Sequence, residues 1–259
     1  MRHVQVHHDP RDVAWLTLDR PEVNNAFNAE LIAELAEAAT RLQARPPRAV
    51  VLAGNGRSFS AGADLEWMRS MRDRSREDNL ADARITSAMF SALDALPCPV
   101  VGRVQGHALG GGVGLVAVCD VVVADRTTVF GFTEVRLGIA PAAISPFVVR
   151  KIGQSHARAL FVTGERFDAA WAQRIGLVHK VVDGEELDSA IAAVLADVLA
   201  SGPAAVTVAK SLPEVASAPL DEATETTATI IAELRTSDEG QEGMAAFLEK
   251  RPPRWAGRG

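Results

Sequence analysis

The sequence of 259 residues, with 47% hydrophobic and 23% charged side chains, has the composition of a globular protein long enough to bury a sizeable core. Its 27 basic and 33 acidic residues give a net charge of −6, which argues against nucleic acid as the main partner. No apolar run has the length that spans a membrane, and no N-terminal segment resembles a signal peptide, so we expect no membrane partner. The two cysteines, Cys98 and Cys119, are expected to be core thiols of a cytoplasmic protein.

The N-terminal segment predicts two strands followed by a helix. Residues 4–7 and 13–18 are strand-like runs separated by turn-forming residues at 9–12. Asn28 is placed to cap a helix that ends at Arg45, before two prolines. Three histidines lack the companion ligands of a metal site, and we expect them to be exposed strand residues: His3, His7 and His8.

A first glycine-bearing loop follows the strand-like run at residues 49–53. It continues as SFSAGADL, residues 58–65, in which Asp64 favours the first turn of a helix running toward Trp67. The segment therefore offers backbone amides at a helix start. Neither G-x-x-x-x-G-K-[ST] nor G-x-G-x-x-G occurs here, and the start of a nucleophile elbow at Gly56 lacks its closing glycine, which argues against a serine hydrolase.

A second loop of the same design lies about fifty residues later. The strand-like run at residues 100–104 leads into three consecutive glycines, Gly110 to Gly112, which are costly unless the backbone itself has a task. Backbone N–H groups at a helix start bind anionic groups, so one interpretation is an oxyanion hole. The alternative is close packing of a strand against a helix. The two similar loops suggest a repeated strand, loop and helix unit.

Glu134 is the carboxylate to which the sequence directs attention. It follows strand-like runs at residues 120–125 and 129–132, and Phe132, Val135 and Leu137 flank it. In such apolar surroundings desolvation would raise its pKa toward values useful for proton transfer. The alternative is an exposed glutamate that opens a helix.

The remaining chain is mostly helical. A last short strand is predicted at residues 179–182, and the composition changes near Asp183. We therefore predict a β/α core over residues 1–183 and a helical region over residues 184–259. Helices are expected at residues 145–152, 155–163, 168–175, 185–200, 203–215, 220–235 and 241–250.

Three motifs with this spacing resemble those of the enoyl-CoA hydratase/isomerase (crotonase) superfamily: SFSAGADL, ALGGGVGL and FTEVRLGIAP. The resemblance extends from LDRPEVNNAF at residues 18–27 to FLEKRPPRW at residues 247–255, and it is strongest to bacterial members described as enoyl-CoA or methylglutaconyl-CoA hydratases. It implies an α/β fold with a ββα spiral core and a C-terminal helical trimerisation region. That region would cover the active site and pack a homotrimer or a dimer of trimers.

The resemblance also implies a site for an acyl-CoA thioester, with coenzyme A present as part of the substrate and no other cofactor or metal. The N–H groups of Ala63 and Gly111 would bind the thioester carbonyl, and Glu134 would be the general acid and base. Trp67, Met68 and Leu137 would line the acyl pocket, although helical spacing also suits plain core packing for the first two. The coenzyme A contacts would be Glu22, Val23, Asn25, Arg57, Ala61, Gly62, Asp64, Leu65 and Gly110.

Gly114 departs from the family pattern. In well-known hydratases of the family the first of two catalytic glutamates stands two places after the glycine triplet, and here that residue is glycine. The resemblance implies a 2-enoyl-CoA hydratase; the alternatives are a Δ3,Δ2-enoyl-CoA isomerase with a single glutamate and a catalytically silent CoA-thioester-binding protein. We expect Gly114→Glu to increase hydration if the pocket has room.

Overall fold

A six-stranded sheet forms the centre of the computed structural model, which describes residues 1–256; residues 257–259, the end of the predicted helical region, lie outside it. The sheet has the order β1-β2-β3-β4-β6-β9 and is parallel except for the β1–β2 pair. Every residue of β3 is buried, as expected for a parallel strand covered on both faces. The strands are β1 (Val4–His8), β2 (Val13–Leu18), β3 (Ala49–Gly54), β4 (Val100–Val104), β6 (Val121–Asp125) and β9 (Lys180–Val182).

A smaller sheet has three strands in the order β5-β7-β8, and these strands are interspersed along the chain with strands of the larger sheet. Its strands are β5 (His107–Leu109), β7 (Val129–Gly131) and β8 (Arg166–Asp168). The chain therefore runs from a strand of the large sheet to a strand of the small sheet and then to a helix, first as β4-β5-α4 and again as β6-β7-α5. This repetition confirms the predicted spiral of ββα units.

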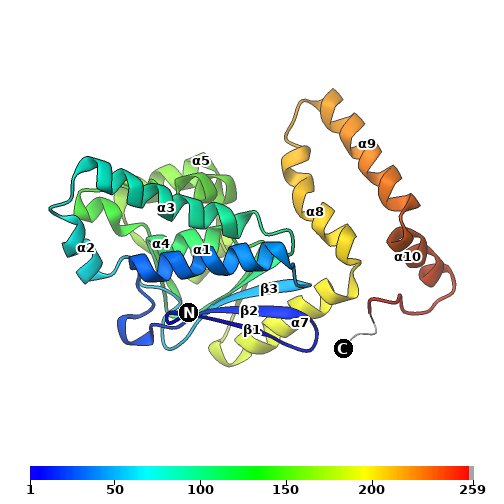
Figure 1. Ribbon diagram of the computed structural model, residues 1–259, viewed down its shortest axis with the longest axis horizontal. Coiled ribbons are helices and arrows are strands. Elements are labelled where there is room, and N and C mark those ends of the chain that lie inside the picture. The colour runs from blue at the N-terminus through cyan, green and yellow to red at the C-terminus, as the bar shows by residue number, and fades with distance from the viewer. Residues whose placement is uncertain (257–259) are drawn as a thin grey trace.

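Helices cover both faces of the large sheet (Figure 1). On one face α1 (Ala29–Ala44), α3 (Arg76–Asp94), α4 (Gly111–Ala117) and α5 (Ser145–Thr163) contribute to the larger hydrophobic core. On the other face α7 (Leu187–Ala200) packs Leu187, Ile191 and Leu195 against valines of the strands. The helix α7 is therefore part of the core, although its residues belong to the helical region predicted from residue 184 onward.

The helices α8 (Pro203–Val215), α9 (Leu220–Thr236) and α10 (Asp238–Leu248) project from the body, and we call them the C-terminal arm (Figure 1). Few of its residues are buried, whereas Leu220, Phe247 and Leu248 are each about 80% exposed, with values of 83%, 84% and 79%. The arm is joined to the core by an ion pair between Lys210 Nζ and Asp120 Oδ2 at 2.8 Å.

The helix boundaries follow local signals closely. Asn28 Oδ1 accepts a hydrogen bond from Leu31 N at 2.8 Å, which confirms the predicted N-cap of α1. The two helices predicted between residues 145 and 163 form one element that is broken at Gly153, where φ is +75°. The remaining short helices are α2 (Leu65–Met71), α6 (Ala169–Arg174) and the 3₁₀ turns Pro21–Val23, Thr133–Leu137 and Gly184–Glu186.

Within residues 1–256 no single helix has the length and apolar character needed to cross a bilayer. Only α7 and α8 taken together pass such a test, and they are bent by 106° relative to each other.

Candidate active site

The two glycine loops lie side by side and are joined by backbone hydrogen bonds. Ser60 N donates to His107 O at 2.9 Å, and Leu109 N donates to Ser60 O at 3.0 Å. The approach is so close that a Cβ atom on Gly112 would stand 2.6 Å from Ser60 O, and one on Gly62 would stand 3.0 Å from Leu109 O. Glycine is thus required where one backbone meets the other, as the packing interpretation proposed.

The same arrangement leaves two amides without acceptors. Phe27 N donates to Gly62 O at 2.7 Å and Asp64 N donates to Phe27 O at 2.9 Å, so the intervening Ala63 N–H points away from this pairing. Among the described residues no acceptor is recorded for it. Gly111 is the first residue of α4, where N–H groups have no intrahelical partner. Close packing of the loops therefore coexists with free amides, so the two interpretations offered by the sequence do not exclude each other.

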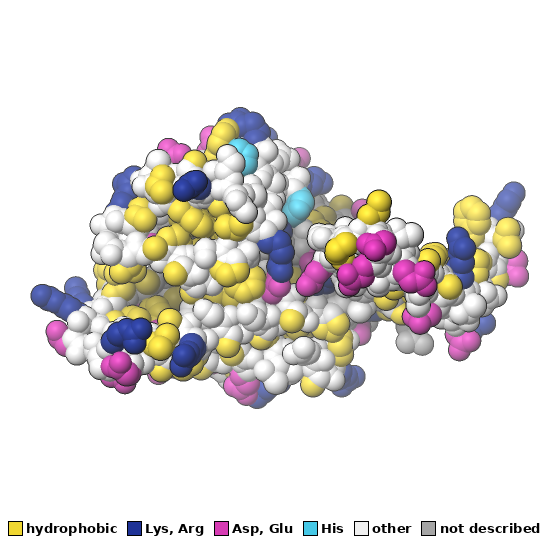
Figure 2. Space-filling model, turned by 90° about the horizontal axis from the view of Figure 1, so that it is seen from above, with side chains coloured by type: hydrophobic (Ala, Val, Ile, Leu, Met, Phe, Trp, Pro, Cys, Tyr) yellow, Lys and Arg dark blue, Asp and Glu magenta, His cyan; other side chains and the backbone are white. Residues whose placement is uncertain are grey.

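Ala63 and Gly111 both line a cavity of about 360 Å³. Its walls are mostly apolar, and Figure 2 shows hydrophobic side chains gathered around a hollow in the body of the molecule, away from the acidic side chains of the projecting part. The predicted pocket residues Trp67, Met68 and Leu137 all line it. So do the predicted loop residues Ala61, Gly62, Leu65 and Gly110, and Met71, which follows Trp67 and Met68 at the helical spacing expected of a pocket wall. Sequence reasoning missed the other lining residues: Phe27, Thr86, Phe90, Thr133, Ile139, Ala140, Pro141, Ala142, Ala143 and Ile144.

Glu134 is the only ionisable side chain among the lining residues that the structure describes. It lies in the 3₁₀ turn Thr133–Leu137, and its carboxylate faces the second loop, because Oε1 would stand 3.0 Å from a Cβ atom on Gly110. Its Oε2 is buried and has no hydrogen-bond partner within residues 1–256. Burial raises the pKa of Glu134, the direction predicted from its neighbours. Apolar residues of the cavity wall surround the carboxylate, and Leu137, one of them, is itself 57% exposed.

Gly114 does not line the cavity, which corrects its predicted place in the site. It is buried in α4, and a Cβ atom there would stand 2.8 Å from Phe90 Cε1 and closer still to Ile144 Cγ2. Real side chains do not tolerate such contacts, so the place of a second glutamate is filled by carbon. Phe90 and Ile144 occupy the space that a side chain at position 114 would need.

The side chains of two expected coenzyme A contacts have structural roles. Asn25 is fully buried, and its side chain accepts from Arg20 N and donates to Ser58 O, at 2.8 Å in each case. Asp64 is also buried; it caps α2 by accepting from Glu66 N at 2.8 Å and pairs with Arg20 Nη2 at 2.9 Å. Both residues hold the first loop in place, and neither carries a free polar group toward a ligand.

The other expected contacts form an exposed surface. Glu22 and Val23 lie in the short turn Pro21–Val23, and Glu22 is exposed. Arg57 is exposed as well, and its Nε donates to Asn24 Oδ1 at 2.8 Å. This contact places the guanidinium beside the turn that contains Glu22, so the structure brings these three residues together outside the cavity.

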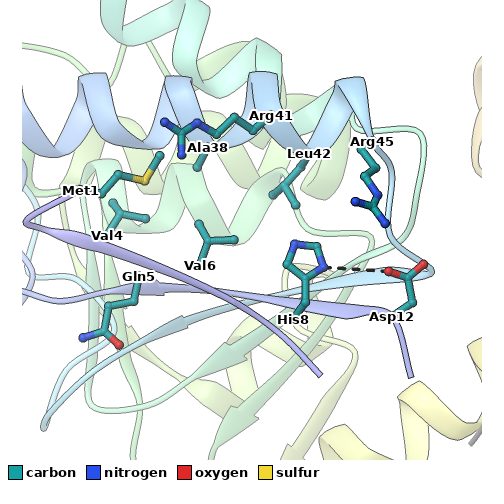
Figure 3. Close-up of a pocket in the computed structure, with 10 residues that line it drawn as sticks. All are labelled: Met1, Val4, Gln5, Val6, His8, Asp12, Ala38, Arg41, Leu42 and Arg45. Carbon is teal, nitrogen blue, oxygen red and sulfur yellow. Dashed lines mark ion pairs between the residues drawn. The ribbon is translucent and has the colours of Figure 1, made fainter. Parts of the chain in front are cut away.

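A larger groove of about 770 Å³ lies elsewhere, between β1 and α1 (Figure 3). Its lining includes Arg41, Arg45 and His8, whose Nδ1 is 3.9 Å from Asp12 Oδ1. It shares no lining residue with the cavity around Glu134 and contains neither glycine loop. Size alone is a poor guide here, since the smaller cavity brings together the buried carboxylate and the free amides.

No residue of the C-terminal arm lines the cavity, so within the single chain the arm does not cover the site, and the predicted cover stays a prediction for the oligomer. The arm projects away from the body instead (Figure 1). Hydrophobic periodicity predicts that these helices exist, but it does not predict the direction in which they run from the core.

Comparisons with known proteins agree with this architecture. The family model described as Enoyl-CoA hydratase/isomerase matches residues 9–258. The crystal structure of an enoyl-CoA hydratase from Shewanella pealeana is 36% identical in sequence and has a TM-score of 0.93. The match covers 98% of this chain and 96% of that one. An enoyl-CoA hydratase structure from Mycobacterium smegmatis is 35% identical with a TM-score of 0.92, covering 98% of this chain and 99% of that one. A crotonyl-CoA hydratase from Syntrophomonas wolfei is 33% identical over 92% of both chains. The chain belongs to the enoyl-CoA hydratase/isomerase (crotonase) family.

Proposed function

We propose that this protein is an enoyl-CoA hydratase that adds water across the 2,3 double bond of a 2-enoyl-CoA thioester. One observation carries the proposal: in residues 1–256 a single buried carboxylate, Glu134, shares an apolar cavity with two backbone amides, Ala63 N–H and Gly111 N–H, that have no hydrogen-bond acceptor there. The names of the relatives support the same reaction. The substrate supplies coenzyme A as part of the thioester, and the reaction needs no other cofactor.

The two amides would bind the thioester carbonyl oxygen. When the oxygen of water bonds to Cβ, the electrons of the double bond move into the thioester and form an enolate, whose negative oxygen the amides stabilise. One such donor is commonly worth ~2.7 to 4 kcal/mol of transition-state stabilisation. The amides are fixed in the folded chain by the hydrogen bonds between the loops, so they need no reorganisation during the reaction.

Glu134 would move the proton. As the ionised base it takes a proton from the attacking water, and as the resulting acid it delivers a proton to Cα of the enolate, which restores the thioester and regenerates the carboxylate. The unpartnered Oε2 is free to accept the first proton. The raised pKa reduces the free-energy difference between the ionised and protonated carboxyl near neutral pH, which suits a group that must serve as both base and acid.

A second candidate is Δ3,Δ2-enoyl-CoA isomerisation, and the exclusion of a second carboxylate from position 114 favours it. Glu134 would remove a proton from Cα of a 3-enoyl-CoA and return it to Cγ, with the same amides stabilising the dienolate. This reaction needs one carboxylate and no water. A catalytically silent CoA-thioester-binding protein is the remaining alternative.

The test is a panel of 2-enoyl-CoA and 3-enoyl-CoA substrates with product identification. A 3-hydroxyacyl-CoA product from crotonyl-CoA supports the hydratase. A 2-enoyl-CoA product from a 3-enoyl-CoA without hydration of crotonyl-CoA would establish the isomerase, and no turnover of either would leave the silent protein. Glu165→Gln is a matched control for Glu134→Gln, because Glu165 is an exposed glutamate outside the cavity.

We also propose that the protein forms a homotrimer or a dimer of trimers through the C-terminal arm and acts in the cytoplasm. The apolar side chains that the arm exposes, among them Leu220, Phe247 and Leu248, support the oligomer. Cys98 and Cys119 are buried as free thiols, which suits a reducing compartment.

A further inference from the structure

The charge of the cavity walls limits what the acyl group can carry. Glu134 is the only ionisable side chain among the described lining residues, and no lysine, arginine or histidine accompanies it. Arginines occur nearby in the sequence at positions 69, 72 and 136, but none of them lines the cavity. An acyl group bound here would meet one negative charge and no positive charge.

The interior wall is built from aromatic and aliphatic carbon. Phe90 packs between Phe27 and Phe147, with ring centroids 6.2 Å and 6.0 Å apart, and Ile144 lies beside it over Gly114. Phe90 and Ile144 are both buried and both line the cavity. This wall closes the place at which a polar side chain would otherwise enter from α4.

The polar groups that remain are neutral. They are the hydroxyls of Thr86 and Thr133 and the indole N–H of Trp67, whose Nε1 is buried without a partner within residues 1–256. A neutral donor provides a single hydrogen bond. It does not replace the cation that a buried carboxylate needs to offset its lost hydration.

We propose that this cavity selects enoyl-CoA thioesters whose acyl group is uncharged and rejects those whose acyl group ends in a second carboxylate. The proposal rests on the proposed function and narrows its substrate class. Its physical basis is the wall formed by Phe27, Phe90 and Ile144, which offers an acyl carboxylate no counter-charge.

The kinetic test compares three thioesters of similar length. These are trans-2-hexenoyl-CoA, glutaconyl-CoA, which carries a terminal carboxylate, and the methyl ester of glutaconyl-CoA, which masks it. We expect kcat/KM for glutaconyl-CoA to be at least ~10²-fold below that for hexenoyl-CoA, because a buried unpaired charge is strongly disfavoured. The methyl ester should recover most of the loss. Equal values for the free acid and the neutral thioesters would overturn the proposal.

A binding test separates this inference from the proposed reaction. The dissociation constants of hexanoyl-CoA and glutaryl-CoA, which are saturated and cannot react, are measured by calorimetry. We expect hexanoyl-CoA to bind at least ~10-fold more tightly, since the glutaryl carboxylate must remain in water or be desolvated. That result would support the selectivity even if no enoyl-CoA were turned over, and equal binding would contradict it even if hydration were observed.

Glu134→Gln distinguishes the wall from simple repulsion by Glu134. The substitution removes the only ionisable group among the described lining residues and keeps the size of the side chain. If the uncharged wall causes the selectivity, Glu134→Gln should still prefer hexanoyl-CoA over glutaryl-CoA by several-fold. Complete loss of the preference in this variant would assign it to Glu134 and refute the role of the wall.

Discussion

Introducing a glutamate at position 114 should lower the free energy of unfolding and should not increase the rate of hydration. A β-carbon at this position already meets Phe90 Cε1 at 2.8 Å and Ile144 more closely. Overpacking of this kind typically costs ~1 to 3 kcal/mol, and burying an unpaired polar group adds ~1 to 3 kcal/mol in protein variants. Replacing glycine within α4 returns only ~1 kcal/mol through helix propensity. The free energy of unfolding should therefore fall by roughly 1 to 5 kcal/mol in Gly114→Glu.

Gly114→Ala isolates the steric part of this effect. It adds the β-carbon and gains the same propensity, so we expect a net loss of roughly 0 to 2 kcal/mol. In a background of Ile144→Ala, which removes Cγ2, the added carbon should cost less than it does in the wild-type background. A double-mutant cycle measures this coupling directly.

Urea unfolding at one protein concentration measures the stability, because assembly makes the transition concentration-dependent. Hydration of crotonyl-CoA is followed in the same samples. A folded Gly114→Glu protein that is as stable as wild type and hydrates faster would refute the argument, since it would show that Phe90 and Ile144 move aside without cost.

Four further outcomes are expected. Glu134→Gln should lower kcat at least ~10²-fold with little change in thioester affinity, whereas Glu165→Gln should not, as steady-state kinetics and binding would reveal. Because the folded-state pKa of Glu134 is raised, activity should fall as the pH drops through that pKa. The raised pKa means that Glu134 contributes to the free energy of unfolding at acid pH and that this contribution is lost as the pH rises through the folded-state pKa. Glu134→Gln should therefore be more stable than the wild type at pH 7, and the difference in stability should disappear at acid pH. Ala63→Pro removes one oxyanion donor and should cost ~10²- to 10³-fold in kcat; full turnover in a correctly folded variant would place the oxyanion hole elsewhere. Sedimentation should show a trimer or a multiple of it, and deletion of the chain from Ala218 onward should dissociate the assembly, whereas a monomer at micromolar concentration would contradict this assignment.

Sequence reasoning succeeded where structure is determined by neighbouring residues. Asn28 and Asp64 cap helices because each side-chain oxygen accepts a hydrogen bond from a backbone N–H two or three residues later, an interaction that depends only on local sequence. The helix at residues 203–215 begins at Pro203, whose fixed φ favours a first helical position, and its predicted limits match α8. Glu134 was found because its motif and its apolar flanks agreed.

It failed where distant segments decide the outcome. The strands β5 and β8 have three residues each, too few for a periodic pattern, and they exist because β7 pairs with both. The neighbours of Gly114 come from α3 and from the residue just before α5, thirty places away in the chain, so no local signal reports that the position is full. Asn25 and Asp64 belong to recognisable motifs, yet only the fold shows that their polar atoms hold Arg20 and the loops.

The hydrogen-bonded contact between the two glycine loops has a consequence for how this protein tolerates mutation. The proposed oxyanion donors are main-chain atoms, so no side-chain exchange at Ala63 would delete one unless the new residue is proline. The sensitive positions are instead the glycines that let the two backbones meet, such as Gly62, with φ +89°, and Gly112. A saturation scan of these loops would therefore show the strictest requirement at residues that never touch the substrate through a side chain. In these loops, substitutions that change the path of the backbone should therefore be tolerated less well than substitutions that change only the chemistry of a side chain.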